Sequence, residues 1–276
     1  MRFSLQPVPI LLILLLLTAS CRGYDLRLLQ GWDRLEMDCC YVQIQEGMDP
    51  GRVEAAIRWK WPMIQTLQER FFPSLADFKP LIVVYPDQES YKRSSEHLPS
   101  NALAHYDRSR KAIHVSLDAP DPVWRHEMSH LYLDELSSKA PFWFQEGLAR
   151  FLQNYNTQKN PCSEQAMLPE FRVWVEKNPD SLVLESMELP TSVDFLDPDG
   201  TAQKTVLSGV FVYFLWTRGD LTDIMRGLRE NPKSDPLFHV TFGERGAMNQ
   251  LRRDYIEYLE KPVFNVAPSS CKPGGG

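Results

Sequence analysis

Two histidines and a glutamate form the most informative pattern in the sequence. The segment His126-Glu127-Met128-Ser129-His130 places the histidines four residues apart, so on a helix both imidazoles can reach one metal ion. Glu127 follows the first histidine and can reach a water bound to that ion. Zinc in hydrolytic sites takes three protein ligands and leaves a fourth position to water. The pattern predicts a hydrolytic zinc site that needs a third ligand; the alternative is a surface helix with two solvated histidines.

The third ligand is expected on the following helix. After His130 the helical pattern breaks over residues 137–140 and restarts at Pro141. A helix that returns antiparallel brings a side chain level with the imidazoles, and Glu146 stands there among apolar residues. A buried carboxylate needs a metal or a counter-charge. Two histidines and a glutamate complete a known catalytic zinc set, whereas the alternative is an ion pair of Glu146 with Arg150, four residues on.

This arrangement resembles a known group of enzymes. The pattern 126–130, followed after fifteen residues by Glu146 within the segment 143–149 (Trp-Phe-Gln-Glu-Gly-Leu-Ala), is similar to the gluzincin clan of zinc metallopeptidases. It is most similar to the peptidase MA-like families, which include many exported bacterial proteins. The similarity extends, more loosely, from about Pro80 to Leu259. The resemblance implies an α+β, thermolysin-like zincin fold, with a small mixed sheet and a hairpin above the metal helix and a helical C-terminal lobe.

The resemblance also implies a role for each site residue. His126, His130 and Glu146 would hold Zn2+, and Glu127 would be the general base. Zinc would polarise the scissile carbonyl and lower the pKa of its water, while Glu127 would take the proton and deliver it to the leaving amine. Tyr213 is the candidate for steadying the oxyanion. Its apolar neighbours leave open that Tyr213 is only a core residue.

Groups that support the site are less determined. Either Asp134 or Glu135 could orient a histidine as a hydrogen-bonded carboxylate. Tyr106 is a second candidate for the oxyanion. His105 and His114 flank a hairpin turn, and isolated strand histidines of this kind are expected to be ordinary polar residues.

The metal helix has to be positioned by other elements, which the apolar spacing predicts. Pro62 is expected to kink or break one of the helices. The expected strands are 41–45 and 80–85, with a hairpin of 102–106 and 112–117; the expected helices are 52–72, 88–95, 122–136, 141–154, 165–177, 201–217, 221–230 and 247–259.

The N-terminus has the pattern of an export signal. Arg2 precedes an apolar run, 10–17, which is too short to span a bilayer, and small residues lead to Cys21. Residues 1–20 are therefore expected to be a signal peptide of the lipoprotein type, with a lipid on Cys21 that anchors the chain to a membrane. Cleavage and simple secretion remain the alternative. Arg22 favours the outer membrane, by resemblance to other lipoproteins.

The rest of the chain is expected to form one catalytic domain, residues 37–265, between a tether (21–36) and a disordered tail (266–276). Within it we expect a sheet-bearing part to about residue 118, the metal helix pair (121–154) and a helical part to about 260. Export would place four cysteines in an oxidising compartment, where they could form two disulfides of undetermined pairing. The adjacent pair is not expected to bond to each other without strain. These cysteines are Cys39, Cys40, Cys162 and Cys271.

Composition restricts the possible partners. The 276 residues carry a net charge of −6, which argues against a nucleic-acid partner. A peptide or protein substrate is expected. Two alternatives remain: a catalytically silent exported lipoprotein that uses the fold as a binding module, and a zinc amidase that acts on cell-wall material. The sequence does not distinguish an endopeptidase from an aminopeptidase, and it leaves the oligomeric state open.

Overall fold

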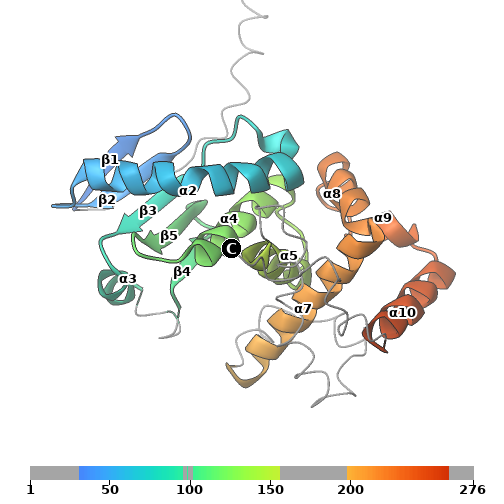
Figure 1. Ribbon diagram of the computed structural model, residues 1–276. Coiled ribbons are helices and arrows are strands. Elements are labelled where there is room, and N and C mark those ends of the chain that lie inside the picture. Colours follow the sequence, from blue (N-terminus) through green and yellow to red (C-terminus); the bar gives the residue numbers. More distant parts are fainter. Residues whose placement is uncertain (1–30, 96–97, 99–101, 156–197, 261–276) are drawn as a thin grey trace, which may run out of the picture.

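The computed structural model describes residues 31–95, 98, 102–155 and 198–260. Over these residues the chain forms five strands, eight α-helices and a short 3-10 turn, so it is α+β as the sequence predicts (Figure 1). No described helix has the length and apolar character needed to cross a membrane. The predicted signal peptide with Cys21, the helix 165–177, Cys162, Cys271 and the tail 266–276 lie outside the described residues.

The five strands form one mixed sheet in the order β1-β2-β3-β5-β4. The three inner strands are parallel, and each edge strand is antiparallel to its neighbour. The hairpin and both predicted single strands are therefore confirmed. The strands are β1 (Trp32–Glu36), β2 (Tyr41–Gln45), β3 (Leu81–Tyr85), β4 (Ala104–Asp107) and β5 (Ala112–Ser116).

The predicted tether was wrong over its last residues. The segment 32–36 is β1, which pairs with β2 so that Trp32 lies opposite Gln45 and Glu36 opposite Tyr41. This strand lies at the edge of the sheet, and none of its residues is fully buried. An edge strand exposed in this way carries no alternating apolar pattern, which explains why the sequence did not reveal it.

One face of the sheet packs against helices α2 (Pro50–Phe71) and α4 (Asp121–Leu136). The prediction that Pro62 breaks α2 was wrong, because the helix continues through it. Proline removes the hydrogen bond to the carbonyl four residues earlier. That carbonyl belongs to Arg58, and both Pro62 and Arg58 are exposed, so water can replace the missing donor.

The other face of the sheet carries α3 (Gln88–Ser94). Its Tyr91 is buried and packs edge-on against Tyr85 of β3, with ring centroids 5.5 Å apart. The remaining helices follow α4 in the chain and lie on one side of it (Figure 1). They are α5 (Phe142–Asn154), α7 (Pro198–Arg218), α8 (Asp220–Glu230), the unpredicted short α9 (Phe238–Thr241) and α10 (Arg245–Glu260).

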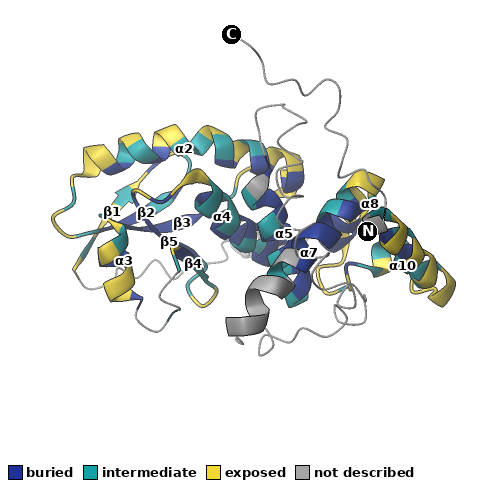
Figure 2. Ribbon diagram, turned by 60° about the horizontal axis from the view of Figure 1, so that its bottom comes forward, coloured by how far each residue is buried: buried dark blue, intermediate teal, exposed yellow. Residues whose placement is uncertain are grey.

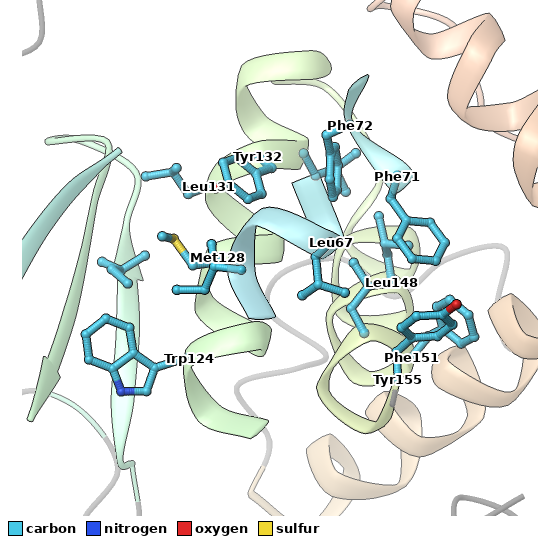
Figure 3. Close-up of a cluster of buried hydrophobic side chains, with 14 of the residues drawn as sticks. Leu67, Phe71, Phe72, Trp124, Met128, Leu131, Tyr132, Leu148, Phe151 and Tyr155 are labelled. Atoms are coloured by element: carbon cyan, nitrogen blue, oxygen red, sulfur yellow. The ribbon is translucent and has the colours of Figure 1, made fainter. Parts of the chain in front are cut away.

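A single large core joins the sheet to these helices. Figure 3 shows its central part, where side chains of α2, α4 and α5 meet. Phe71 of α2 packs edge-on against Phe151 of α5, and Met128 of α4 is fully buried. In Figure 2 buried residues mark the neighbouring helices α4, α5 and α7, while the outer side of α2 is exposed. The core therefore fixes α4 and α5, the two helices of the predicted metal site.

Candidate metal centre

Helix α4 has two chemically different sides. Trp124, Met128 and Leu131 recur at the spacing of one helical face and are fully buried in the core. His126 and His130 lie on the opposite side and are only partly buried. The apolar side therefore fixes the rotation of α4, and this rotation presents both imidazoles away from the core.

Helix α5 runs antiparallel to α4. Near the start of α4, the Arg125 guanidinium donates to the Gln153 carbonyl near the end of α5, at 2.7 and 3.0 Å. Further along α4, His130 Nε2 lies 3.5 Å from Glu146 Oε1. The buried side of α5 contains Leu148 and Phe151, so Glu146 and Gln153 share the side that faces the histidines.

Gly147 allows a third helix to approach the site. A Cβ atom at this position would lie 2.6 Å from the Ser208 carbonyl oxygen and 2.8 Å from Val212 Cγ2, both on α7. Such distances are shorter than real Cβ contacts, so only glycine permits this packing of α5 on α7. The residue next to Glu146 is thus fixed by backbone contact.

The side chains of His126, His130 and Glu146 converge. The two Nε2 atoms are 3.1 Å apart, and Glu146 oxygens lie 3.8 Å from His126 Nε2 and 3.5 Å from His130 Nε2. Ligand atoms about 2.0–2.1 Å from a tetrahedral zinc ion are separated by roughly 3.3–3.5 Å. The three separations lie close to this value. The donor set and its spacing therefore fit a divalent metal ion, with zinc among those it could hold.

The histidines have the protonation that a metal ligand requires. Burial lowers the pKa of both His126 and His130 to about 4, so both are neutral at neutral pH. Gln153 Oε1 lies 3.2 Å from Nδ1 of His126. An amide oxygen only accepts hydrogen bonds, which places the proton on Nδ1 and leaves the lone pair on Nε2. The nitrogen that faces Glu146 is therefore the one able to bind a cation.

Glu127 lies in the same polar cluster. It is buried, and burial together with the charge of Glu146 raises the pKa of its carboxyl to about 8. A backbone hydrogen bond from Tyr106 of β4 acts in the opposite direction. Burial also raises the pKa of Glu146, and only the protonated form of His126 opposes this effect. A divalent cation between these groups would favour the charged form of both carboxyls.

The carboxylates proposed to orient the histidines have other described contacts. Asp134 is buried, accepts a hydrogen bond of 3.0 Å from the Tyr106 hydroxyl, and lies 2.9 Å from Nε of Arg108. Glu135 forms an ion pair with Lys111. Both acids therefore hold the β4–β5 hairpin on α4. In the described structure the orienting partner of His126 is Gln153, which the sequence reasoning missed.

The other predicted residues lie around this centre. The described ring contact of Tyr213 is with Phe151 on the core face of α5, where the two ring centroids are 6.3 Å apart. The role of Tyr213 in stabilising the oxyanion stays a prediction. His105 and His114 stack on each other at 4.5 Å on the sheet face that carries α3. Arg150 donates to Gln153 Oε1 at 3.4 Å, whereas the described ion pairs of Glu146 are with the two histidines.

Comparison of the sequence with family models and with curated proteins gave no match. The functional argument therefore depends on the residues of the site.

Proposed function

We propose that the chain is a zinc-dependent peptidase with a thermolysin-like arrangement of its site. The observation that carries the proposal is the convergence of His126, His130 and Glu146 at ligand spacing, with Glu127 buried beside them. Two neutral imidazoles and a carboxylate are the ligand set of several catalytic zinc sites. A merely structural zinc would be expected to have a fourth protein ligand, and among the described residues the cluster holds three.

The residues have distinct roles in the proposed reaction. His126, His130 and Glu146 would hold Zn2+, and the chemistry that a bound zinc ion would supply is Lewis acidity toward a carbonyl group and toward water. Glu127 would be the general base, which would take a proton from the attacking water and deliver it to the leaving amine. The hydrogen bond from the Tyr106 backbone holds the Glu127 carboxylate in position. Gln153 keeps the proton of His126 on the nitrogen that faces away from the ion.

Strand β4, beside the site, could bind a peptide substrate. β4 is an edge strand, and such strands accept an extended peptide by backbone hydrogen bonds. Tyr106 connects this strand to Glu127. We also propose, from the N-terminal sequence, that a lipid on Cys21 anchors the enzyme to a membrane, facing the periplasm or the cell exterior, with the outer membrane favoured.

The first test is metal content together with peptide cleavage. We expect about one zinc ion per chain, cleavage of casein or a peptide library, and loss of cleavage after chelation. Glu146→Ala should lose both zinc and cleavage. Glu127→Gln should keep zinc and lose most of kcat, because it removes only the base. A chain that binds no zinc when zinc is supplied would refute the proposal.

The same assay separates the alternatives. Zinc binding without cleavage of peptides, but with release of fragments from purified cell wall, would identify an amidase. Zinc binding with neither activity would identify a binding module. Tyr213→Phe tests the remaining assignment: an oxyanion donor should cost about a hundredfold or more in kcat with zinc content unchanged, whereas a core residue should leave kcat close to wild type.

A further inference from the structure

Cys39 and Cys40 face each other in the turn between β1 and β2. Their Sγ atoms are 3.2 Å apart, and neither is part of a disulfide. A hydrogen bond of 3.0 Å from Met37 N to the Cys40 carbonyl closes this turn. From their adjacency, these two cysteines were not expected to bond to each other without strain, yet the fold holds their sulfurs in contact.

The two sulfurs differ in access. Cys39 lines a surface pocket of about 710 Å3, and its side chain is partly exposed. Cys40 is fully buried behind it. The pocket lies between the turn and α2, with Trp61 and Arg58 on the helix side. Its volume is in the range that holds small molecules, so a small reagent can reach Cys39 before it reaches Cys40.

The surroundings also shift the pKa values of the two thiols in opposite directions. A hydrogen bond from Cys40 lowers the pKa of Cys39, and Arg58 acts in the same direction against burial and Asp38. The same bond and burial raise the pKa of Cys40, while Lys79 opposes this. The accessible thiol of Cys39 is therefore the one that ionises more readily to the thiolate, and the buried thiol of Cys40 keeps its proton.

We propose that Cys39 and Cys40 form a thiol–disulfide exchange site for small-molecule disulfides. The Cys39 thiolate attacks one sulfur of the disulfide R–S–S–R, forms a mixed disulfide and releases one thiolate RS−. Cys40 then gives its proton to the released thiolate and attacks the Cys39 sulfur, which releases the second RS−. In total the protein is oxidised to one internal disulfide, and the small disulfide is reduced to one thiol and one thiolate, which takes up from water the proton that Cys39 had released.

The proposed bond should be easy to reverse. Adjacent Cα atoms are about 3.8 Å apart across a trans peptide, below the roughly 4.4–6.8 Å usual for a disulfide. The ring that closes is therefore strained, and strained disulfides are readily reduced. The strain favours a reversible exchange site over a permanent cross-link. The exchange proposal does not depend on the metal site.

The test is peptide mapping of the intact chain. The protein is reduced, exposed in its native state to oxidised glutathione, treated with an alkylating agent and digested with trypsin. Both cysteines lie in one tryptic peptide, Leu35–Arg52, so an internal disulfide lowers its mass by two hydrogens and blocks alkylation. We expect this product, and we expect dithiothreitol to reverse it. Two alkylated cysteines, or a disulfide from this peptide to Cys162 or Cys271, would overturn the proposal.

Two serine variants test the order of attack. Cys40→Ser should keep glutathione on Cys39 as a stable mixed disulfide, because the resolving thiol is absent. Cys39→Ser should leave Cys40 without glutathione at times when wild type is fully oxidised. Equal reaction of Cys40 in this variant would refute the assigned roles. Circular dichroism and zinc content, both expected to match wild type, show that the variants are folded.

Discussion

Oε1 of Gln153 lies 3.2 Å from Nδ1 of His126. The glutamine is seven residues after Glu146, so both side chains occupy one face of α5. One helix therefore supplies a proposed ligand and the group that orients another ligand. The relationship gives Gln153 a role that is distinct from metal ligation and can be measured separately.

We expect Gln153→Ala to weaken zinc binding about 10- to 100-fold, as is usual when a partner of a ligating histidine is lost. The measurement is competition with a zinc chelator of known affinity. Gln65→Ala is the matched control, because Gln65 is an exposed glutamine on α2 whose described partner is Glu69. Equal zinc affinity in Gln153→Ala and wild type would show that the hydrogen bond does not support the site.

Gly147→Ala should destabilise the protein and weaken zinc binding at the proposed site. The added methyl group meets the Ser208 carbonyl at 2.6 Å, so α7 has to move away from α5. Overpacking of this kind costs about 1–3 kcal/mol. Urea unfolding and zinc competition would both report the change, because Glu146 is the neighbouring residue.

Gly246→Ala is the control for that substitution. Gly246 lies in α10, and a Cβ there meets nothing within 4 Å. Alanine is the better helix former, so this variant should be as stable as wild type or slightly more stable. If Gly147→Ala behaves in the same way, the close contact of α5 with α7 is not rigid.

In the metal-free protein, Glu127→Gln should raise stability, and more so at higher pH. The pKa of Glu127 is about 8 when folded, against an ordinary value of 4.5. A raised pKa contributes stability that is full below pH 4.5 and is lost as pH rises toward 8. Glutamine cannot ionise, so the variant does not lose this stability. Its free energy of unfolding should exceed that of wild type by the order of a few kcal/mol near the folded pKa of Glu127.

The measurement is urea unfolding with a chelator present at several pH values between 4.5 and about 8. Glu54→Gln on α2 is the control, since Glu54 pairs with Arg58 in a solvent-exposed contact. A difference between Glu127→Gln and wild type that does not change with pH would contradict the burial of an ionisable carboxyl beside Glu146.

Tyr106→Phe should weaken the attachment of the hairpin to α4. The substitution removes the hydroxyl that donates to the buried Asp134 at 3.0 Å. Loss of one partner of a buried polar pair costs about 1–3 kcal/mol. Zinc content should be unchanged, because the hydroxyl is not among the converging atoms. Tyr41→Phe on β2 is the control; its hydroxyl makes no hydrogen bond among those described, and unfolding of both variants in urea provides the comparison.

The sequence predicted the central part of the fold because that part obeys simple periodicity. The apolar residues of β3 and β5 and the face of α4 with Trp124 and Leu131 are buried, as their spacing requires. The break before Pro141 correctly separated α4 from α5. These features are local, so a pattern along the chain is sufficient to find them.

Features that depend on distant contacts were missed. β1 is a strand because β2 pairs with it, not because its own residues alternate. Asp134 and Glu135 looked like partners of the histidines, but their described ion pairs are with Arg108 and Lys111 of the hairpin. One feature of the sequence pointed to Gln153: it lies seven residues after Glu146 and therefore on the same helical face. That spacing indicates a contact with His126 only once α4 and α5 are known to be antiparallel.

The continuous core has a consequence for how the chain can be shortened. Trp143 of α5 packs on Phe211 of α7, with ring centroids 5.6 Å apart, and Phe211 packs on Tyr255 of α10 at 4.9 Å. A truncation after Tyr155 would keep every residue of the metal centre but expose these aromatic surfaces to water. Such a fragment should aggregate. The C-terminal helices therefore belong to the smallest unit that can be expressed, and they could not be lost in evolution unless another element replaced them.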